Sequence, residues 1–417
     1  MVYLLIGALT LGMGQDTLVI TLEDATRRAL DISPAVAAAR GAIHIPRGER
    51  AEAFWPFPDN PAVSFGRVRR RSPGTTVFDR EWSITQSVGI SGDWLVRTSA
   101  AGQRIKAAEE LVADAERRVR MQTSFLYLDL AIAERQAALA DSNAMFAERL
   151  AQFARRQMAA GEINRLEQNT AILEAARARS RAERARANTE AAAAQLHRML
   201  GLSGDPDLRT SSLPAVPVGP VPDADVLLGI AWDRRPDLRA ATFGLRAAGR
   251  DVTAARLSVI PQLTVSLISG REDGTDRLRG FAIGFSVPLF HNGQQTRGLA
   301  TAGRAAAAAT LTAVERALRA DVVAALSRFH RARNAERRFA SDVLRAAADN
   351  VALTETALTE GEVSLTDVVV LRSAAVNAQI EYLDVRADLT RAWFALAGAL
   401  DLTPHALNEL LGNPEDQ

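Results

Sequence analysis

The stretch Ala160-Gly161-Glu162-Ile163 returns about 200 positions later as Glu360-Gly361-Glu362-Val363. In the same register, Leu200-Gly201-Leu202 matches Leu400-Asp401-Leu402 with no gap in between. Self-similarity at one long offset marks a duplicated structural unit. The sequence therefore predicts two repeats that contain the same elements in the same order, each with a glycine turn ahead of its last helix.

The predicted repeats cover residues 16–202 and 224–402. Residues 203–223 lie between them and contain five prolines, which lack a backbone N–H and fit neither a helix interior nor a central strand. This segment is therefore expected to be a connector. Residues 1–15 resemble the apolar part of a clipped signal segment, the alternative being a disordered or buried N-terminus, and residues 403–417 form a C-terminal tail.

Each predicted repeat contains two segments in which apolar residues alternate with small or polar ones, as in strands with one apolar face. These segments lie at about 61–69 and 80–91, and at about 261–270 and 280–290. Their apolar positions include Trp82, Ile84, Val88, Phe281, Ile283 and Phe285. The small polar positions are Ser83, Thr85, Ser87, Thr264 and Ser266. Each pair is predicted to form a hairpin closed by a polar loop.

Long helical stretches follow the hairpins, at about 95–159 and 295–359. The first has apolar residues at sevenfold spacing, which is typical of coiled coils: Phe125, Ile132, Leu139, Phe146 and Phe153. At about 1.5 Å per residue, such a helix is roughly 100 Å long. Shorter helices are predicted at 22–57, 224–258 and 363–400. The last has two apolar seams, so it is expected to contact two neighbours in a wall of helices.

The predicted strands are about as long as a tilted strand that crosses a bilayer. Four strands cannot close a barrel, and an open sheet edge in lipid leaves backbone groups without partners. Three copies would supply twelve strands around a water-filled lumen. We therefore expect a homotrimer with the apolar positions toward lipid and the small polar positions toward the lumen. The alternative is a soluble sandwich packed on helices.

Composition and motifs exclude several classes of function. The chain has 50 basic and 49 acidic residues, so it lacks the basic surplus of a nucleic-acid-binding protein. It has no cysteine, and its five histidines are far apart in sequence. None of the familiar catalytic or nucleotide-binding motifs is present. We expect no catalytic residue, no cofactor site and no metal site, and hence no enzyme.

This organisation resembles the TolC-like outer-membrane efflux channels and, more loosely, their CzcC/CusC-like heavy-metal-efflux branch. The resemblance depends on the duplicated plan, on residues 285–290 with Asn292-Gly293-Gln294, and on residues 361–368. It implies a mainly α fold with a small β part, in which a trimeric twelve-stranded transmembrane β-barrel with four strands per chain continues into a long periplasmic α-helical barrel. It also implies a periplasmic adaptor protein, an inner-membrane transporter and outer-membrane lipid as partners.

The same resemblance makes the turns at Gly161 and Gly361 the periplasmic tip, where the adaptor docks and the pore is narrowest. Glu167 and Asp367 stand six residues after these glycines. A trimer would bring six such carboxylates together in a ring that attracts cations. The best-known family members have a second acid where this chain has Val370. For the acids, the alternative is a pair of exposed carboxylates that stabilise helix starts. The glycines are expected to be helix C-caps as well, and this can hold together with a place at the tip.

The resemblance implies that the protein is the channel component of a tripartite efflux pump, located in the bacterial outer membrane and extending into the periplasm. It would be a passive exit duct for small molecules or metal ions, gated at the tip. Two alternatives remain open. One is the outer-membrane channel of a type I protein secretion system, which shares the fold. The other is a soluble coiled-coil scaffold.

Overall fold

The computed structural model describes residues 17–203, 207–216, 219–272, 276–340, 343, 345–346, 349–350, 353 and 363–412. Gly361, the segment 1–15 and most of the predicted helical stretch beyond residue 340 lie outside these residues. The chain forms two compact units. One combines the residues up to Pro34 with Glu116–Arg234 and the residues from Ala320 onward, and the other combines Ala35–Ala115 with Arg235–Arg319.

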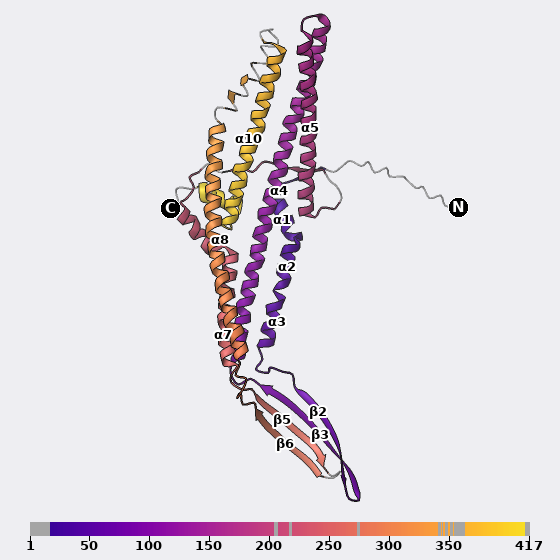
Figure 1. Ribbon diagram of the computed structural model, residues 1–417, viewed down its shortest axis with the longest axis vertical. Helices are drawn as coiled ribbons and strands as arrows, with labels where there is room; N and C mark the ends of the chain where they lie inside the picture. The colour runs from indigo at the N-terminus through magenta and orange to yellow at the C-terminus, as the bar shows by residue number, and fades with distance from the viewer. Residues whose placement is uncertain are drawn as a thin grey trace, which may run out of the picture. The chain divides into compact units, whose positions relative to one another are not determined.

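The duplicated plan and the mainly helical fold with a small β part are confirmed (Figure 1). The first repeat contains α1 (Leu22–Ile32), α2 (Pro34–Ala42), α3 (His44–Ala53), β2 (Ala62–Ser72), β3 (Thr75–Val88), α4 (Asp93–Ala160) and α5 (Arg165–Leu200). The second contains α6 (Ala224–Arg234), α7 (Pro236–Leu257), β5 (Leu263–Glu272), β6 (Asp276–Phe285), α8 (Gln294–Ala340) and α10 (Leu365–Ala399). Pro34 and Pro236 begin equivalent helices, at the position where a missing N–H costs nothing.

The four long strands form one antiparallel sheet in the order β2-β3-β5-β6. The central pairing joins β3 of the first repeat to β5 of the second, with Ile84 opposite Leu267. Figure 1 shows the four strands side by side, with the β2–β3 turn at the end of the sheet remote from the adjoining helices. The outer strands, β2 and β6, have no further strand partner among the described residues.

Two strands differ from their predicted bounds. β3 begins at Thr75 instead of about residue 80, because Pro73-Gly74 makes a two-residue turn in which Gly74 has φ +88°. Pro followed by a residue with positive φ is the usual centre of a type II turn. β6 covers Asp276–Phe285 instead of about 280–290. Its ladder stops before Pro288, which cannot donate a backbone hydrogen bond.

The helices of the first unit pack through alanines. Ala140, Ala144 and Ala147 of α4 form a buried cluster with Ala178 and Ala182 of α5. Small side chains let two helix axes approach closely. The larger residues of the predicted heptad, Phe125, Leu139, Phe146 and Phe153, are only half-buried in the single chain. The sevenfold pattern thus identified the helix correctly, but of its five apolar residues only Ile132 is buried in the single chain.

Two short strands were not predicted. β1 (Thr17–Ile20) pairs in parallel with β4 (Asp207–Thr210), which lies inside the proline-rich connector. Tyr127 of α4 is 1% exposed and donates a hydrogen bond to the Ser212 carbonyl at 3.0 Å. The C-terminal tail also contains a helix, α11 (Pro404–Gly412). In the described part of the chain, no helix is long and apolar enough to cross a membrane.

Candidate functional site

Gly161 ends α4 at the turn that leads to α5. Its φ is +78°, in the left-handed region that favours glycine. The Gly161 N–H donates to the Met158 carbonyl at 3.1 Å, and the Glu162 N–H donates to the Gln157 carbonyl at 2.9 Å. These bonds satisfy carbonyls at the helix C-terminus. The C-cap expectation is therefore confirmed for Gly161, and its place at the tip stays a prediction.

Glu167 occupies the third position of α5 and closes a capping box with Asn164. The Asn164 side chain accepts the Glu167 N–H at 2.9 Å, and the Glu167 carboxylate accepts the Asn164 N–H at 3.0 Å. This reciprocal pair satisfies two backbone donors at the helix start. The carboxylate is half-buried and therefore has a defined structural task.

Asp367 has the same place at the start of α10. The Ser364 hydroxyl accepts the Asp367 N–H at 3.2 Å and donates to the Asp367 carboxylate at 2.7 Å. The Asp367 side chain is exposed. The two repeats thus build their last helix from equivalent capping boxes. The sequence analysis missed Asn164 and Ser364, although the spacing of a cap residue and an acid three positions later is a recognised signal.

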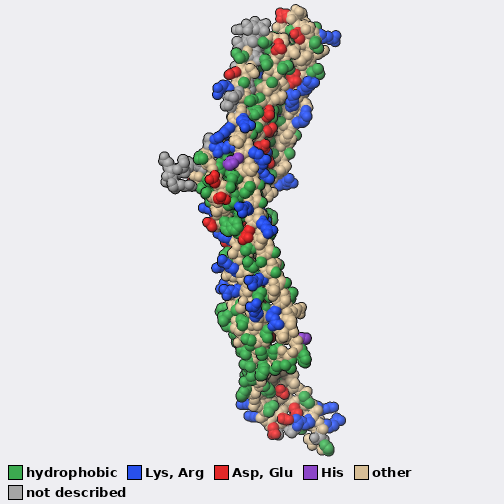
Figure 2. All heavy atoms as spheres, turned by 60° about the vertical axis from the view of Figure 1, so that its left-hand side comes forward, with side chains coloured by type: hydrophobic (Ala, Val, Ile, Leu, Met, Phe, Trp, Pro, Cys, Tyr) green, Lys and Arg blue, Asp and Glu red, His purple; other side chains and the backbone are tan. Residues whose placement is uncertain are grey.

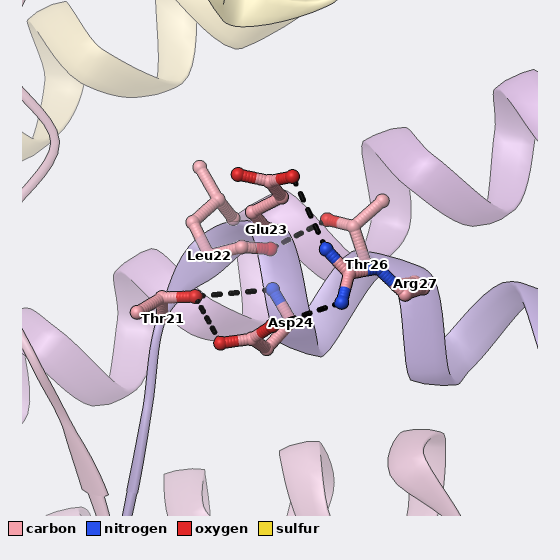
Figure 3. A network of polar contacts seen from close by, with 6 residues as sticks. All are labelled: Thr21, Leu22, Glu23, Asp24, Thr26 and Arg27. Carbon is pink, nitrogen blue, oxygen red and sulfur yellow. Dashed lines mark hydrogen bonds and ion pairs between the residues drawn. The ribbon is translucent and has the colours of Figure 1, made fainter.

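A third helix start shows how general this arrangement is. At the beginning of α1, Thr21 accepts the Asp24 N–H at 3.1 Å and donates its hydroxyl proton to the Asp24 carboxylate at 2.7 Å (Figure 3). Arg27 also lies 3.4 Å from Asp24. Unlike the start of α5, the start of α1 does not follow a glycine turn. An acid three positions after a cap residue thus contributes to capping at all three helix starts, and a role of Glu167 and Asp367 at a pore stays a prediction.

Both capped helix starts contribute to one hydrophobic cluster. Leu365 and Val368 of α10 pack with Ala171 of α5 and with Leu150 and Ala154 of α4. Ile163 from the α4–α5 turn and Val363 pack against the same cluster. Glu167 and Asp367 therefore stand at helix starts that share a core, as expected for equivalent parts of the two repeats.

The sheet separates the two sets of predicted strand residues. The register puts Trp82, Ile84, Val88, Phe281, Ile283 and Phe285 on one face, which we call the apolar face. Ser83, Thr85, Ser87, Thr264 and Ser266 lie on the other, the polar face. Hydroxyl pairs join neighbouring strands on the polar face, Ser64 with Ser83 at 2.8 Å and Thr85 with Ser266 at 2.9 Å.

The apolar face is unusually open to solvent in the single chain. Phe281, Ile283 and Phe285 of β6 are 73%, 61% and 66% exposed, and Trp82 of β3 is 56% exposed. No helix covers these side chains, so the sandwich-like packing weighed above does not occur at these four positions.

Among the residues that the structure describes, no group of three or more His, Cys, Asp or Glu side chains is arranged to hold a metal ion.

Comparison with known proteins identifies related sequences and folds. Residues 227–401 match the family model described as "Outer membrane efflux protein". No curated protein matches the sequence.

Three solved structures share the fold. A membrane protein from Pseudomonas aeruginosa is 21% identical, with a TM-score of 0.75 over 91% of this chain and 90% of its own. CusC is 16% identical, with a TM-score of 0.74 over 94% of this chain and 95% of its own. The open state of the MtrE outer membrane channel from Neisseria gonorrhoeae is 18% identical, with a TM-score of 0.71 over 91% and 89%.

Proposed function

We propose that this protein is the outer-membrane channel of a tripartite efflux pump. The resemblance to the outer-membrane efflux family, seen in the match over residues 227–401 and in the shared fold, supports this proposal. Three copies form a passive exit duct for small molecules or metal ions. The duct crosses the outer membrane as a β-barrel and continues into the periplasm as a tube of helices. An inner-membrane transporter supplies the energy.

The observation that carries this proposal is a sheet with two open edges and an exposed apolar face. The free edges of β2 and β6 each present unpaired backbone groups. In hydrocarbon, such groups cost several kcal/mol each unless they are paired. Pairing β6 of one copy with β2 of the next removes every edge, and three copies make a closed barrel of twelve strands.

The two faces of the sheet suit a barrel of this kind. The apolar face carries the exposed aromatic and aliphatic side chains of β3 and β6, which would contact lipid. The polar face carries hydroxyl pairs between strands, which would line a water-filled lumen. Transmembrane barrels alternate apolar and polar residues in this way along every strand.

The helices also have surface that a single chain leaves uncovered. Leu299 of α8 is 68% exposed, and the alanine run 305–309 is exposed or half-buried. In the first unit, Phe146 and Phe153 of α4 are half-buried. Contacts with neighbouring copies would bury this surface, as in a wall of helices with two seams per helix. The periplasmic adaptor would dock on the helix turns, of which the α4–α5 turn at Gly161 is described.

Fractionation and single-channel recording test the proposal. The full chain, expressed with a secretory signal, should be recovered from the outer membrane as a detergent-resistant trimer, and the purified trimer should conduct ions in a planar bilayer. Recovery as a soluble monomer or dimer would contradict it and support a soluble scaffold. Efflux assays with cells that carry a pump and adaptor would then separate small-molecule or metal export from protein secretion.

A further inference from the structure

The apolar face of the sheet ends in a group of arginines near the hairpin turns. Seven arginines lie on this face, all of them exposed, and we call them the arginine group. They are Arg67, Arg69, Arg71, Arg80, Arg271, Arg277 and Arg279. No acidic residue lies on the same face within the residue ranges of β2, β3, β5 and β6. Figure 2 shows basic side chains, together with the acids of the polar face, at the foot of the view, beyond a hydrophobic zone.

Four members of the arginine group form a single row across the whole sheet. Arg67 lies opposite Arg80, Arg80 opposite Arg271, and Arg271 opposite Arg277. Neighbouring strands are only about 4.8 Å apart, and like charges directly opposite each other destabilise a sheet. The row therefore has a free-energy cost that an anion bound across it would remove.

The described carboxylates do not neutralise this row. None of them lies within 4.0 Å of a guanidinium nitrogen of the arginine group, and the nearest ring contact is Arg67 over Phe78 at 4.2 Å. The acidic residues of the strands are Asp79, Glu81, Glu272 and Asp276, and all four lie on the polar face. There Arg70 lies 3.0 Å from Asp79 and 2.5 Å from Glu272.

Charge is thus sorted by face. The polar face mixes both signs, which suits contact with water, whereas the apolar face beyond its hydrophobic rows is purely positive. A strand end surrounded by water on both sides has no physical reason to keep all its acids on one side. The sorting indicates that the apolar face meets an anionic surface where its hydrophobic rows end.

We infer that the arginine group binds phosphate-bearing lipid headgroups. This inference depends on the proposed function, in which the apolar face lies against lipid. Arg279 shares its row with Phe65, Trp82 and Ser269, and aromatic rings of this kind favour the boundary between hydrocarbon and headgroups. The row of four arginines lies one step farther toward the turns, at headgroup level. Guanidinium groups bind phosphate through two parallel hydrogen bonds.

A trimer would repeat the row three times and distribute guanidinium groups around the barrel near the turn end of the strands. Each headgroup could then bridge arginines of adjacent strands, and the repulsion within each row would be replaced by attraction. Free phosphate has the same chemistry but no acyl chains, so it would gain nothing from the adjoining hydrophobic rows. The structure favours the lipid for this reason.

Lipid binding by the purified trimer tests the inference. Phosphatidic acid is the probe and phosphatidylcholine the neutral reference, with bound lipids counted by native mass spectrometry. The double variant Arg80→Gln/Arg271→Gln should lose at least tenfold of the preference for phosphatidic acid. The control Arg177→Gln/Arg184→Gln removes two exposed arginines of α5 and should keep the preference.

Thermal unfolding provides a second readout, because the difference in unfolding temperature between the double variant and the wild type should depend on the lipid. In neutral detergent the double variant should unfold at a higher temperature than the wild type, because two repelling charges are gone. With phosphatidic acid added, the wild type should gain more than the variant. An equal gain in both proteins would overturn the inference. If the double variant does not assemble, the single variant Arg271→Gln should still lose at least threefold of the lipid preference.

Two further measurements separate the possible failures. If inorganic phosphate at the same concentration stabilises the wild type as much as phosphatidic acid does, the site binds the phosphate group alone and the assignment to lipid is wrong. If the wild type forms a conducting trimer in phosphatidylcholine but shows no preference for phosphatidic acid, this inference fails and the proposed function stands. If the wild type forms no trimer and does not conduct, the proposed function itself fails.

Discussion

Replacement of Ile283 by arginine tests whether the apolar face lies in lipid. Ile283 is 61% exposed, and on β6 it stands between Phe281 and Phe285 on the same face. Arg279 marks the end of the hydrophobic rows four positions away, which at about 3.3 Å per residue is roughly 13 Å along the strand. With a strand tilt of about 40°, the depth below the arginine is roughly 10 Å.

A depth of this order lies well inside an apolar band that is about 25 Å tall. Arginine near the bilayer midplane costs about 2–4 kcal/mol, and the cost falls toward the interfaces. We therefore expect Ile283→Arg to destabilise the inserted barrel by about 2–3 kcal/mol per chain. Since 1.4 kcal/mol is a factor of ten, the ratio of folded to unfolded protein should fall by roughly 30- to 150-fold.

The control is the adjacent residue on the other face. Ala282 lies opposite Ser266 on the polar face, so Ala282→Arg should point into water and cost under about 1 kcal/mol. Urea titrations of folding into phosphatidylcholine vesicles, followed by tryptophan fluorescence, measure both variants. Equal stability of the two arginine variants would refute the assignment of the two faces, even if a trimer is isolated.

Three further predictions concern the helices. Gly161→Ala should lower the free energy of unfolding by about 1–2 kcal/mol because φ is +78°. Gly102→Ala, in the interior of α4 where a new Cβ meets no atom within 4 Å, should raise it by about 0.5–1 kcal/mol. Chemical denaturation measures both variants, and a change of the same sign in both would contradict the C-cap geometry. The double variant Glu167→Gln/Asp367→Asn keeps acceptors in both capping boxes and removes the charge, so the free energy of unfolding should change by under about 0.5 kcal/mol. If the carboxylates form a ring at the pore, the variant should also lose cation preference in bilayer recordings. Unchanged selectivity would leave these acids with capping alone. Ala178→Leu should lower stability by about 1–3 kcal/mol by overpacking the alanine cluster, whereas Ala176→Leu on the exposed side of α5 should be nearly neutral. Equal melting temperatures of the two variants would contradict the α4–α5 packing.

Local patterns in the sequence determined much of the fold. The alternation around Ile84 and Ile283 and the long heptad stretch predicted the strands and helices, because each pattern depends only on residues a few positions apart. The repetition of Gly161 as Gly361 showed that their order occurs twice. The alternation also sorted residues such as Trp82 and Ser83 onto opposite faces, since successive side chains in a strand point to opposite sides.

Other features could not be predicted because they depend on pairing between distant segments. β1 and β4 have four residues each, too few for a periodic signal, and they form only because each supplies the other's partner. The cluster that α4 forms with α5 consists of alanines such as Ala144 and Ala147, because the close approach of α5 decides which side of the helix is covered there. The capping roles of Glu167 and Asp367 were among the alternatives, and the hydrogen bonds show this capping, whereas a gate role stays a prediction.

The chain by itself determined that there are two repeats, that each contributes a two-faced hairpin, and that long helices accompany them. Only the tertiary structure decided that β3 lies beside β5 and in which register. That pairing brings Arg80 opposite Arg271, although they are far apart in sequence, and completes a row of arginines that no local pattern reveals. The physical reason is that periodicity is set by neighbouring residues, whereas register is set by hydrogen bonds between strands that the chain brings together only when it folds.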